Sequence, residues 1–272
     1  MTMDSPGDLL AAGNLTAAIA AAEGAVKRAP GDLEARWLLA ELLILAGETE
    51  RADGQLDALI SLEPRAAVAA TPIRQLLRAE AARRQFFDEG RVPELLDGAD
   101  EPVREQLRAF VQHRGGEAAA AAATVAAAEA ARPALPGRLA GTASGDRAFT
   151  DFRDLDDLTA GVFEVLTQTG KYYWIPMGRV ASISFSPPQR PLDLIWRKGQ
   201  MCVPEAFEAE VCLPAVYGSL ATADDASRLG RRTDFLGGED EAAIGVGRRL
   251  FVVDGEDAID MLDLERVEFG TS

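Results

Sequence analysis

Histidine and cysteine are nearly absent from this sequence of 272 residues. His113 is the single histidine, and Cys202 and Cys212 are the two cysteines. A structural zinc site needs four such ligands, and a Ser/His/Asp relay would have to use His113 alone. The cysteines lie in a strand-like segment, and we interpret them as buried thiols, with a disulfide as the less favoured alternative. We therefore expect neither a metal nor a cofactor.

Long apolar runs and excess basic charge are also lacking. No window approaches 18 consecutive apolar residues, and residues 1–10 lack the basic and apolar regions of a signal peptide. We therefore expect no membrane insertion and a cytoplasmic location. The net charge is −16, with −7 in residues 1–132 and −9 in residues 133–272. A surface this acidic argues against binding to nucleic acid or anionic lipid.

A repeated pattern near the N-terminus organises the first half of the chain. Its two copies are offset by 34 residues, the period of the tetratricopeptide helical hairpin. In each copy a glycine ends the first helix, a small residue lets the second helix approach closely, and a proline stops that helix. The first copy comprises Gly13, Ala18, Ala25 and Pro30, and the second Gly47, Ala52, Leu59 and Pro64.

A third copy occurs further along, with a slightly shifted spacing. It comprises Gly116, Ala121, Ala128 and Pro133. The alternative is an alanine-rich helical bundle whose glycines and prolines fall at these positions by chance. Apolar periodicity predicts helices at Leu15–Arg28, Leu33–Ala46, Thr49–Leu62, 66–87, Pro102–Arg114 and Glu117–Ala131. Residues 1–132 are thus predicted to form a tetratricopeptide-like helical domain.

Composition changes after residue 132. Residues 133–150 are rich in proline and glycine and are interpreted as a linker. Asp154 is expected to cap a helix that carries apolar residues as far as Leu166. Strands are predicted at Lys171–Ile175, Val180–Phe185, Ala206–Leu213 and Arg248–Val253. We therefore expect a multidomain protein in which residues 151–272 form a smaller α+β domain with a mostly antiparallel sheet.

Three further patterns could carry chemistry. Gly245–Gly247 lacks the third glycine of a dinucleotide-binding loop and is interpreted as a turn. Acidic residues at 151, 154, 156 and 157 could bind a cation, but they are also favoured at a helix N-terminus. Tyr172, Tyr173 and Trp174 could anchor a partner or pack against the core.

Several blocks in the second half resemble one family. Gly170–Pro176 reads Gly-Lys-Tyr-Tyr-Trp-Ile-Pro and resembles the Gly-Arg-Tyr-Tyr-Trp-Leu-Pro segment of the ImpE/TagJ family, also called SciE-type virulence proteins. Asp193–Trp196, Leu213–Tyr217, Arg228–Asp234 and Gly245–Leu250 resemble later blocks in the same order. Two departures are Ala215–Val216, which lacks the usual arginine before the tyrosine, and Met177–Gly178, which replaces a bulkier pair.

This resemblance implies a cytoplasmic, non-enzymatic accessory protein of type VI secretion. Family members are thought to bind an N-terminal helix of the small contractile-sheath subunit and to link the sheath to the ring ATPase that disassembles it. No catalytic residues are implied.

The residues themselves favour a related hypothesis. Stacked helical hairpins form a concave groove that accepts a peptide or a helix. In this hypothesis the aromatic strand at 172–174 contributes a second contact surface. The predicted partner-binding residues are Trp37, Glu41, Leu45, Phe110, His113, Tyr172, Tyr173 and Trp174, with Gln106 and Arg114 also lining the groove.

An enzyme is the alternative hypothesis. Its site would lie in the second domain, and its residues would have to converge on one pocket. The residues considered are Tyr172, Arg231, Arg232, Asp234 and Arg248.

Overall fold

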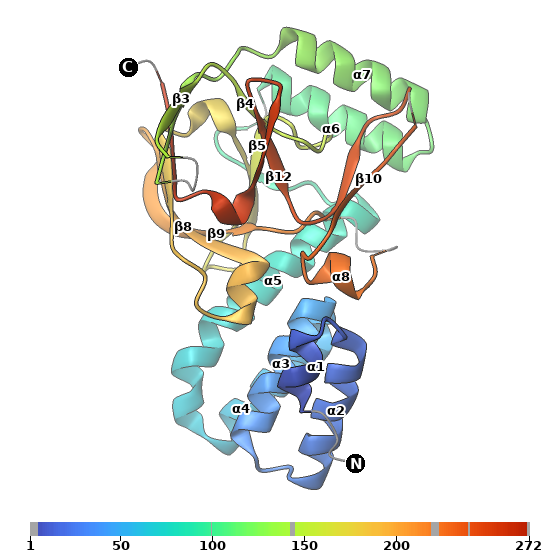
Figure 1. Cartoon of the computed structure of the whole chain (residues 1–272), viewed down its shortest axis with the longest axis vertical. Helices are drawn as coiled ribbons and strands as arrows, with labels where there is room; N and C mark the ends of the chain where they lie inside the picture. Colours follow the sequence, from blue (N-terminus) through green and yellow to red (C-terminus); the bar gives the residue numbers. More distant parts are fainter. Residues whose placement is uncertain (1–4, 99, 142–144, 219–222, 239, 271–272) are drawn as a thin grey trace.

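The computed structural model describes residues 5–98, 100–141, 145–218, 223–238 and 240–270 (Figure 1). The α-helices in these residues are α1 (Pro6–Ala11), α2 (Leu15–Arg28), α3 (Leu33–Ala46), α4 (Thr49–Leu62), α5 (Ala67–Glu89), α6 (Glu101–Arg114), α7 (Ala118–Ala131) and α8 (Asp225–Arg228). Short 3₁₀ turns are η1 (Pro64–Ala66), η2 (Met177–Arg179), η3 (Pro191–Leu194) and η4 (Met261–Asp263).

Strands dominate the second half of the chain. They are β1 (Glu94–Leu95), β2 (Gly137–Ala140), β3 (Arg147–Phe149), β4 (Phe152–Asp154), β5 (Val162–Leu166), β6 (Tyr172–Pro176), β7 (Ser182–Phe185), β8 (Trp196–Val203), β9 (Phe207–Pro214), β10 (Thr233–Leu236), β11 (Ile244–Gly247), β12 (Leu250–Val253), β13 (Asp257–Asp260) and β14 (Arg266–Phe269).

The helices α1–α4 form the two hairpins that the 34-residue period predicts. Gly13 and Gly47 end the first helix of each hairpin with φ of +85° and +79°, a conformation that glycine adopts without strain. Ala18 and Ala52 are fully buried, so the paired helices approach closely there. The repeat prediction is confirmed, and α2, α3 and α4 have the predicted bounds.

The third hairpin forms but does not extend this stack. Gly116 has φ of +77° and Ala121 is buried, as the third copy of the pattern requires. However, α6 and α7 lie at the opposite end of the molecule from α1–α4, and the long helix α5 runs between the two ends (Figure 1). Its helix α6 nevertheless packs on the same face of the sheet as α5, because Phe110 belongs to one core cluster with Phe86 and Trp174.

The predicted mostly antiparallel sheet is also confirmed. Within the described residues the main sheet has nine strands in the order β1-β6-β5-β9-β8-β7-β14-β2-β3. Among these pairs, β1 and β6 run parallel and the others antiparallel. Two smaller sheets, β13-β12-β4 and β10-β11, complete this half.

Two sequence interpretations were wrong. The helix expected after Asp154 is replaced by β4, an irregular turn and β5. Every residue of β5 is buried, so its apolar run lacks the alternation that marks a half-exposed strand.

Residues 133–150 are not a plain linker, because β2 and β3 add to the sheet edge. Gly137 serves close packing there, since a Cβ would lie 2.1 Å from the Glu268 carbonyl oxygen.

Hydrophobic packing joins the helices to the sheet. One core cluster runs from the hairpins through α5 to one face of the sheet, where Phe86 meets Trp174 at 4.9 Å between ring centroids. A second cluster fills the other face, around Phe152, Phe163 and Phe251. In the described part of the chain, no helix combines the length and the apolar character that crossing a bilayer requires.

Candidate functional site

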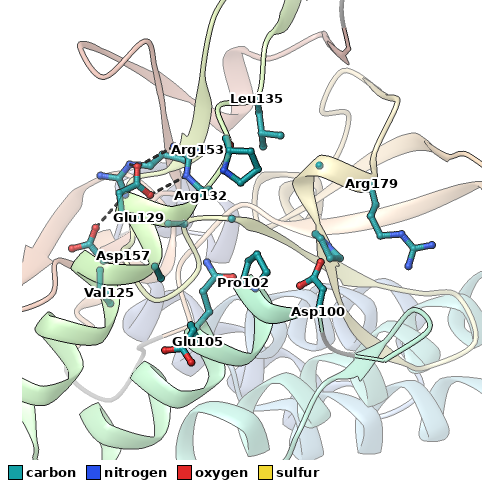
Figure 2. Close-up of a pocket in the computed structure, with 17 residues that line it drawn as sticks. Asp100, Pro102, Glu105, Val125, Glu129, Arg132, Leu135, Arg153, Asp157 and Arg179 are labelled. Atoms are coloured by element: carbon teal, nitrogen blue, oxygen red, sulfur yellow. Dashed lines mark hydrogen bonds and ion pairs between the residues drawn. The ribbon is translucent and has the colours of Figure 1, made fainter.

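A cavity of about 270 Å³ lies where α6 and α7 meet the sheet half (Figure 2). Pro102, Val125 and Leu135 supply apolar surface. Figure 2 shows charged side chains on two sides of the cavity, with Glu129, Arg132, Arg153 and Asp157 on one side and Asp100 and Arg179 on the other. The site is therefore amphipathic, which suits a side chain or helix end better than a small anion alone.

The arginines of the cavity already have carboxylate partners. Arg132 donates to Asp151 at 2.6 and 2.9 Å and to Glu129 at 2.9 and 3.0 Å. Its bond to Asp151 raises the pKa of Arg132, and its bond to Glu129 lowers the pKa of that carboxyl group. Arg153 donates to Asp157 at 3.1 Å. These pairs hold the wall of the cavity in place.

The acidic residues at 154, 156 and 157 organise the loop that borders the cavity. Asp156 accepts hydrogen bonds from the backbone N–H of Leu158 (2.8 Å) and Gly245 (2.9 Å), and Asp157 accepts one from Ala243 (2.8 Å). Burial, and then the charge of Asp154, raise the pKa of Asp156 to about 7. The described residues contain no cluster of His, Cys, Asp or Glu arranged to hold a metal ion.

A buried ion-pair network lies between α5 and the sheet. Arg83 donates to Glu164 at 2.8 and 3.1 Å, and Arg249 bridges Glu164 and Asp154. All four side chains are at most 3% exposed. Burial opposes ionisation of Glu164, but the charges of Arg83 and Arg249 outweigh it and lower the Glu164 pKa to about 2. Tyr217 also donates to Asp154, at 3.0 Å. This network fastens the helices to the sheet.

The predicted groove along α3 is covered by the chain's own second half. The helix packs against η3 and α8, and Leu45 is buried there. Trp37 is half-buried and donates its indole N–H to Glu41 at 3.1 Å. Burial raises the pKa of Glu41. Trp37 and Glu41 therefore keep some exposed surface, whereas Leu45 has none to offer a partner.

The predicted residues of α6 lie far from α3. Phe110 is buried and stacks on Phe86 with 4.0 Å between ring centroids, so it is a core residue. His113 is exposed at the surface, and Arg114 donates to the Asp88 carbonyl at 2.7 Å. Gln106 is buried beside the cavity. The structure therefore does not bring the α3 and α6 sets into one groove.

The aromatic strand faces two ways, as its alternation predicts. Tyr172 and Trp174 are buried, with Trp174 donating to the Tyr172 hydroxyl (2.6 Å) and that hydroxyl donating to Glu164 (2.6 Å). Tyr173 lies on the other face and, with Phe207, lines an apolar hollow of about 460 Å³. Only Tyr173 of the three could contact a partner in this conformation.

The residues of the enzyme hypothesis are engaged in separate structural contacts. Arg231 donates to the carbonyls of Leu10 and Ala11 at the end of α1. The remaining contacts are Arg232 with Asp224, Arg248 with Asp260, and Tyr172 with Glu164, while Asp234 is exposed on β10. These five residues do not converge on a shared pocket.

The cysteines are both free. Cys212 on β9 is buried, and burial raises its thiol pKa to about 12. Cys202 on β8 is half-buried. The interpretation as thiols is confirmed, although Cys202 keeps some exposure.

Sequence reasoning missed Arg83, Glu164 and Arg249. Glu164 had a detectable signal, because it is the single charge in the run Val-Phe-Glu-Val-Leu. A charge within a buried strand requires a partner. Its partners are distant in sequence, so their identity could not be read from spacing.

The fold and its junction define a two-part protein in which tetratricopeptide-like hairpins are locked to a mostly antiparallel sheet domain. Residues 9–71 match the tetratricopeptide repeat model, and residues 146–268 match the model of the ImpE protein family. A Pseudomonas aeruginosa protein named type VI secretion system accessory component TagJ is 32% identical over 264 residues, which cover 96% of this chain and 90% of that protein. The chain belongs to the ImpE/TagJ family.

A solved structure supports the same fold. The crystal structure of protein VPA1032 from Vibrio parahaemolyticus matches with a TM-score of 0.89 and 26% identity, covering 98% of each chain. The similarity therefore includes both the hairpins and the sheet half.

Proposed function

We propose that this chain is a non-enzymatic adaptor of type VI secretion that acts in the cytoplasm. In this role it binds a helix of the small contractile-sheath subunit and links the sheath to the ring ATPase that disassembles it. The observation that carries the proposal is the nearly full-length similarity to a relative named as a type VI secretion accessory component.

The architecture supports the general role of an adaptor that binds other proteins. Tetratricopeptide-like hairpins commonly bind peptides and helices. The buried ion pair between Arg83 on α5 and Glu164 on β5 joins the two halves, which is what a rigid scaffold requires. The enzyme alternative gains no support from its five residues, since four of them make separate structural contacts and Asp234 is exposed on β10.

Calorimetric titration of the intact small sheath subunit into this protein tests the proposal. We expect saturable binding near one-to-one stoichiometry. The subunit should come from the same secretion system, and an unrelated acidic protein of similar size should replace this chain as the control. Absence of binding to the intact subunit would contradict the proposal that this chain binds the contractile sheath.

A further inference from the structure

A small cavity lies where the hairpin helices meet the sheet half, apart from the cavity of Figure 2. Its volume is about 20 Å³, which gives room for one water molecule or one monatomic ion. Residues of α3, α5, α8 and the start of β8 line it. In Figure 1, α8 lies between the hairpins and the sheet. We call this space the junction cavity.

The wall of the junction cavity is mostly positive. Among the described residues that line it, three are arginines and one, Glu80, is a carboxylate. The Glu80 oxygens already accept hydrogen bonds from Arg83 (3.3 Å) and from the indole N–H of Trp196 (3.3 Å). The other lining side chains are aliphatic or aromatic. The wall therefore offers more cationic donors than acceptors.

Arg228 on α8 has no counter-charge. Its side chain is half-buried, and it makes no hydrogen bond or ion pair with the described part of the chain; its Nε is fully buried. The two acids at the start of α8 are engaged elsewhere, because Asp224 pairs with Arg232 (3.3 Å) and Asp225 accepts from Thr16. Withdrawing a charge from water without a partner is costly. An anion beside Arg228 would therefore stabilise the fold.

Arg84 on α5 supplies a second unsatisfied donor. Its Nε is buried without an acceptor, since Oε1 of Glu80 lies 3.7 Å away, beyond hydrogen-bond range. Nη1 of the same guanidinium donates to the Gly47 carbonyl at the end of α3, which holds the side chain in place. Two cations that line one cavity thus each carry a buried N–H group that no described acceptor satisfies.

The ion pairs around the junction cavity leave one positive charge unbalanced. Three carboxylates are shared by three arginines in these pairs, namely Glu80, Glu164 and Asp154 with Arg83, Arg84 and Arg249. Arg228 is a fourth arginine on the same cavity. One monovalent anion would bring the total charge of this group to zero.

We propose that the junction cavity binds one monatomic anion, chloride in the cell, between the Nε–H groups of Arg84 and Arg228. Chloride accepts hydrogen bonds from any direction, and phosphate, sulfate and carboxylates are too large for the volume. A water molecule fits as well, but it brings no charge to balance Arg228. Because elements of both halves border the site, the anion ties the hairpins to the sheet half. This binding does not depend on the adaptor role.

Thermal unfolding in sodium chloride and in sodium gluconate at equal ionic strength tests the proposal. Gluconate is too large for the junction cavity, so only chloride can stabilise the folded state by binding there. We expect the melting temperature of the wild-type protein to be about 2–4 °C higher in chloride and to rise with chloride concentration. Sodium bromide should act like sodium chloride.

Two variants separate binding from general screening by salt. Arg228→Gln should abolish the difference between chloride and gluconate, and it should not lower the melting temperature in gluconate, because the cation it removes has no partner there. Arg232→Gln is the matched control, since Arg232 lies nearby on the chain but is exposed and does not line the cavity. We expect it to keep the wild-type difference.

Anomalous diffraction from wild-type crystals soaked in sodium bromide locates the ion directly and requires no variant to fold. We expect a bromide peak between the Nε atoms of Arg84 and Arg228. Bromide found only at surface arginines, with a water molecule in the junction cavity, would contradict the proposal. An equal chloride effect in the wild-type protein and in Arg228→Gln would contradict it as well.

Discussion

Arg83 on α5 holds Glu164 on β5 through two hydrogen bonds of 2.8 and 3.1 Å, although the two residues are 81 positions apart. The pair crosses the boundary between the helices and the sheet, and both side chains are at most 1% exposed. A bidentate pair at this depth specifies one geometry for the junction. The two halves therefore behave as one scaffold.

Removing one charge of this pair should destabilise the whole chain. Glu164→Gln leaves Arg83 and Arg249 buried without a full counter-charge, and we expect a loss of about 3–5 kcal/mol in the free energy of unfolding. Urea unfolding followed by tryptophan fluorescence measures the loss. The control is Asp53→Asn, which weakens the more exposed pair with Arg74 and should cost under about 1 kcal/mol. Equal effects of the two substitutions would contradict the role of the buried pair.

The buried carboxyl group of Asp156 predicts a pH dependence. Its pKa is about 7 in the folded protein against an ordinary value of 3.8. Between these values the folded state keeps a proton that the unfolded state releases, so this group's stabilising contribution falls as pH rises. The side chain of the Asp156→Asn variant cannot ionise. We therefore expect the fall in the free energy of unfolding between pH 5 and pH 8 to be smaller in this variant by roughly 2 kcal/mol. Urea midpoints at several pH values measure it, and parallel curves for both proteins would contradict the prediction.

Phe110 illustrates what sequence alone could not reveal. The sequence predicts the helix that carries Phe110 and a partner-binding role for that residue, but it does not show what the helix packs against. The side of α6 that carries Phe110 packs on Phe86 and the sheet rather than lining a groove.

Local signals such as Gly47 predict helix ends accurately, because the residues that end a helix lie within a few positions of its last turn. The β5 segment was misread because its burial on both sides depends on distant strands.

Phe110→Ala should therefore act on stability rather than on a binding surface alone. Truncating this stacked, buried ring should cost about 3–5 kcal/mol of unfolding free energy. Val111→Ala provides the neighbouring control, because Val111 is 67% exposed, and its cost should stay below about 0.5 kcal/mol. Thermal and urea unfolding both measure the difference. If Phe110→Ala leaves the free energy of unfolding unchanged, Phe110 becomes a candidate partner-binding residue again.

The second half also caps the first helices. Asp225 accepts hydrogen bonds from the backbone N–H (2.9 Å) and hydroxyl (3.1 Å) of Thr16 near the start of α2. Asp225→Ala should cost about 1 kcal/mol and accelerate amide exchange in the first turn of α2. Asp32→Ala removes the cap of α3 instead, so faster exchange should move to that helix. Unchanged exchange at α2 would show that the hairpins do not depend on this contact.

The central claim is that one molecule joins the sheath subunit to the ring ATPase. Sedimentation velocity of the three purified proteins, alone and mixed, tests it most directly. The account predicts a faster boundary that contains all three proteins and forms only when this chain is present. If the small sheath subunit and the ATPase displace each other from this chain, or if the boundary forms equally well without it, the linking role is contradicted.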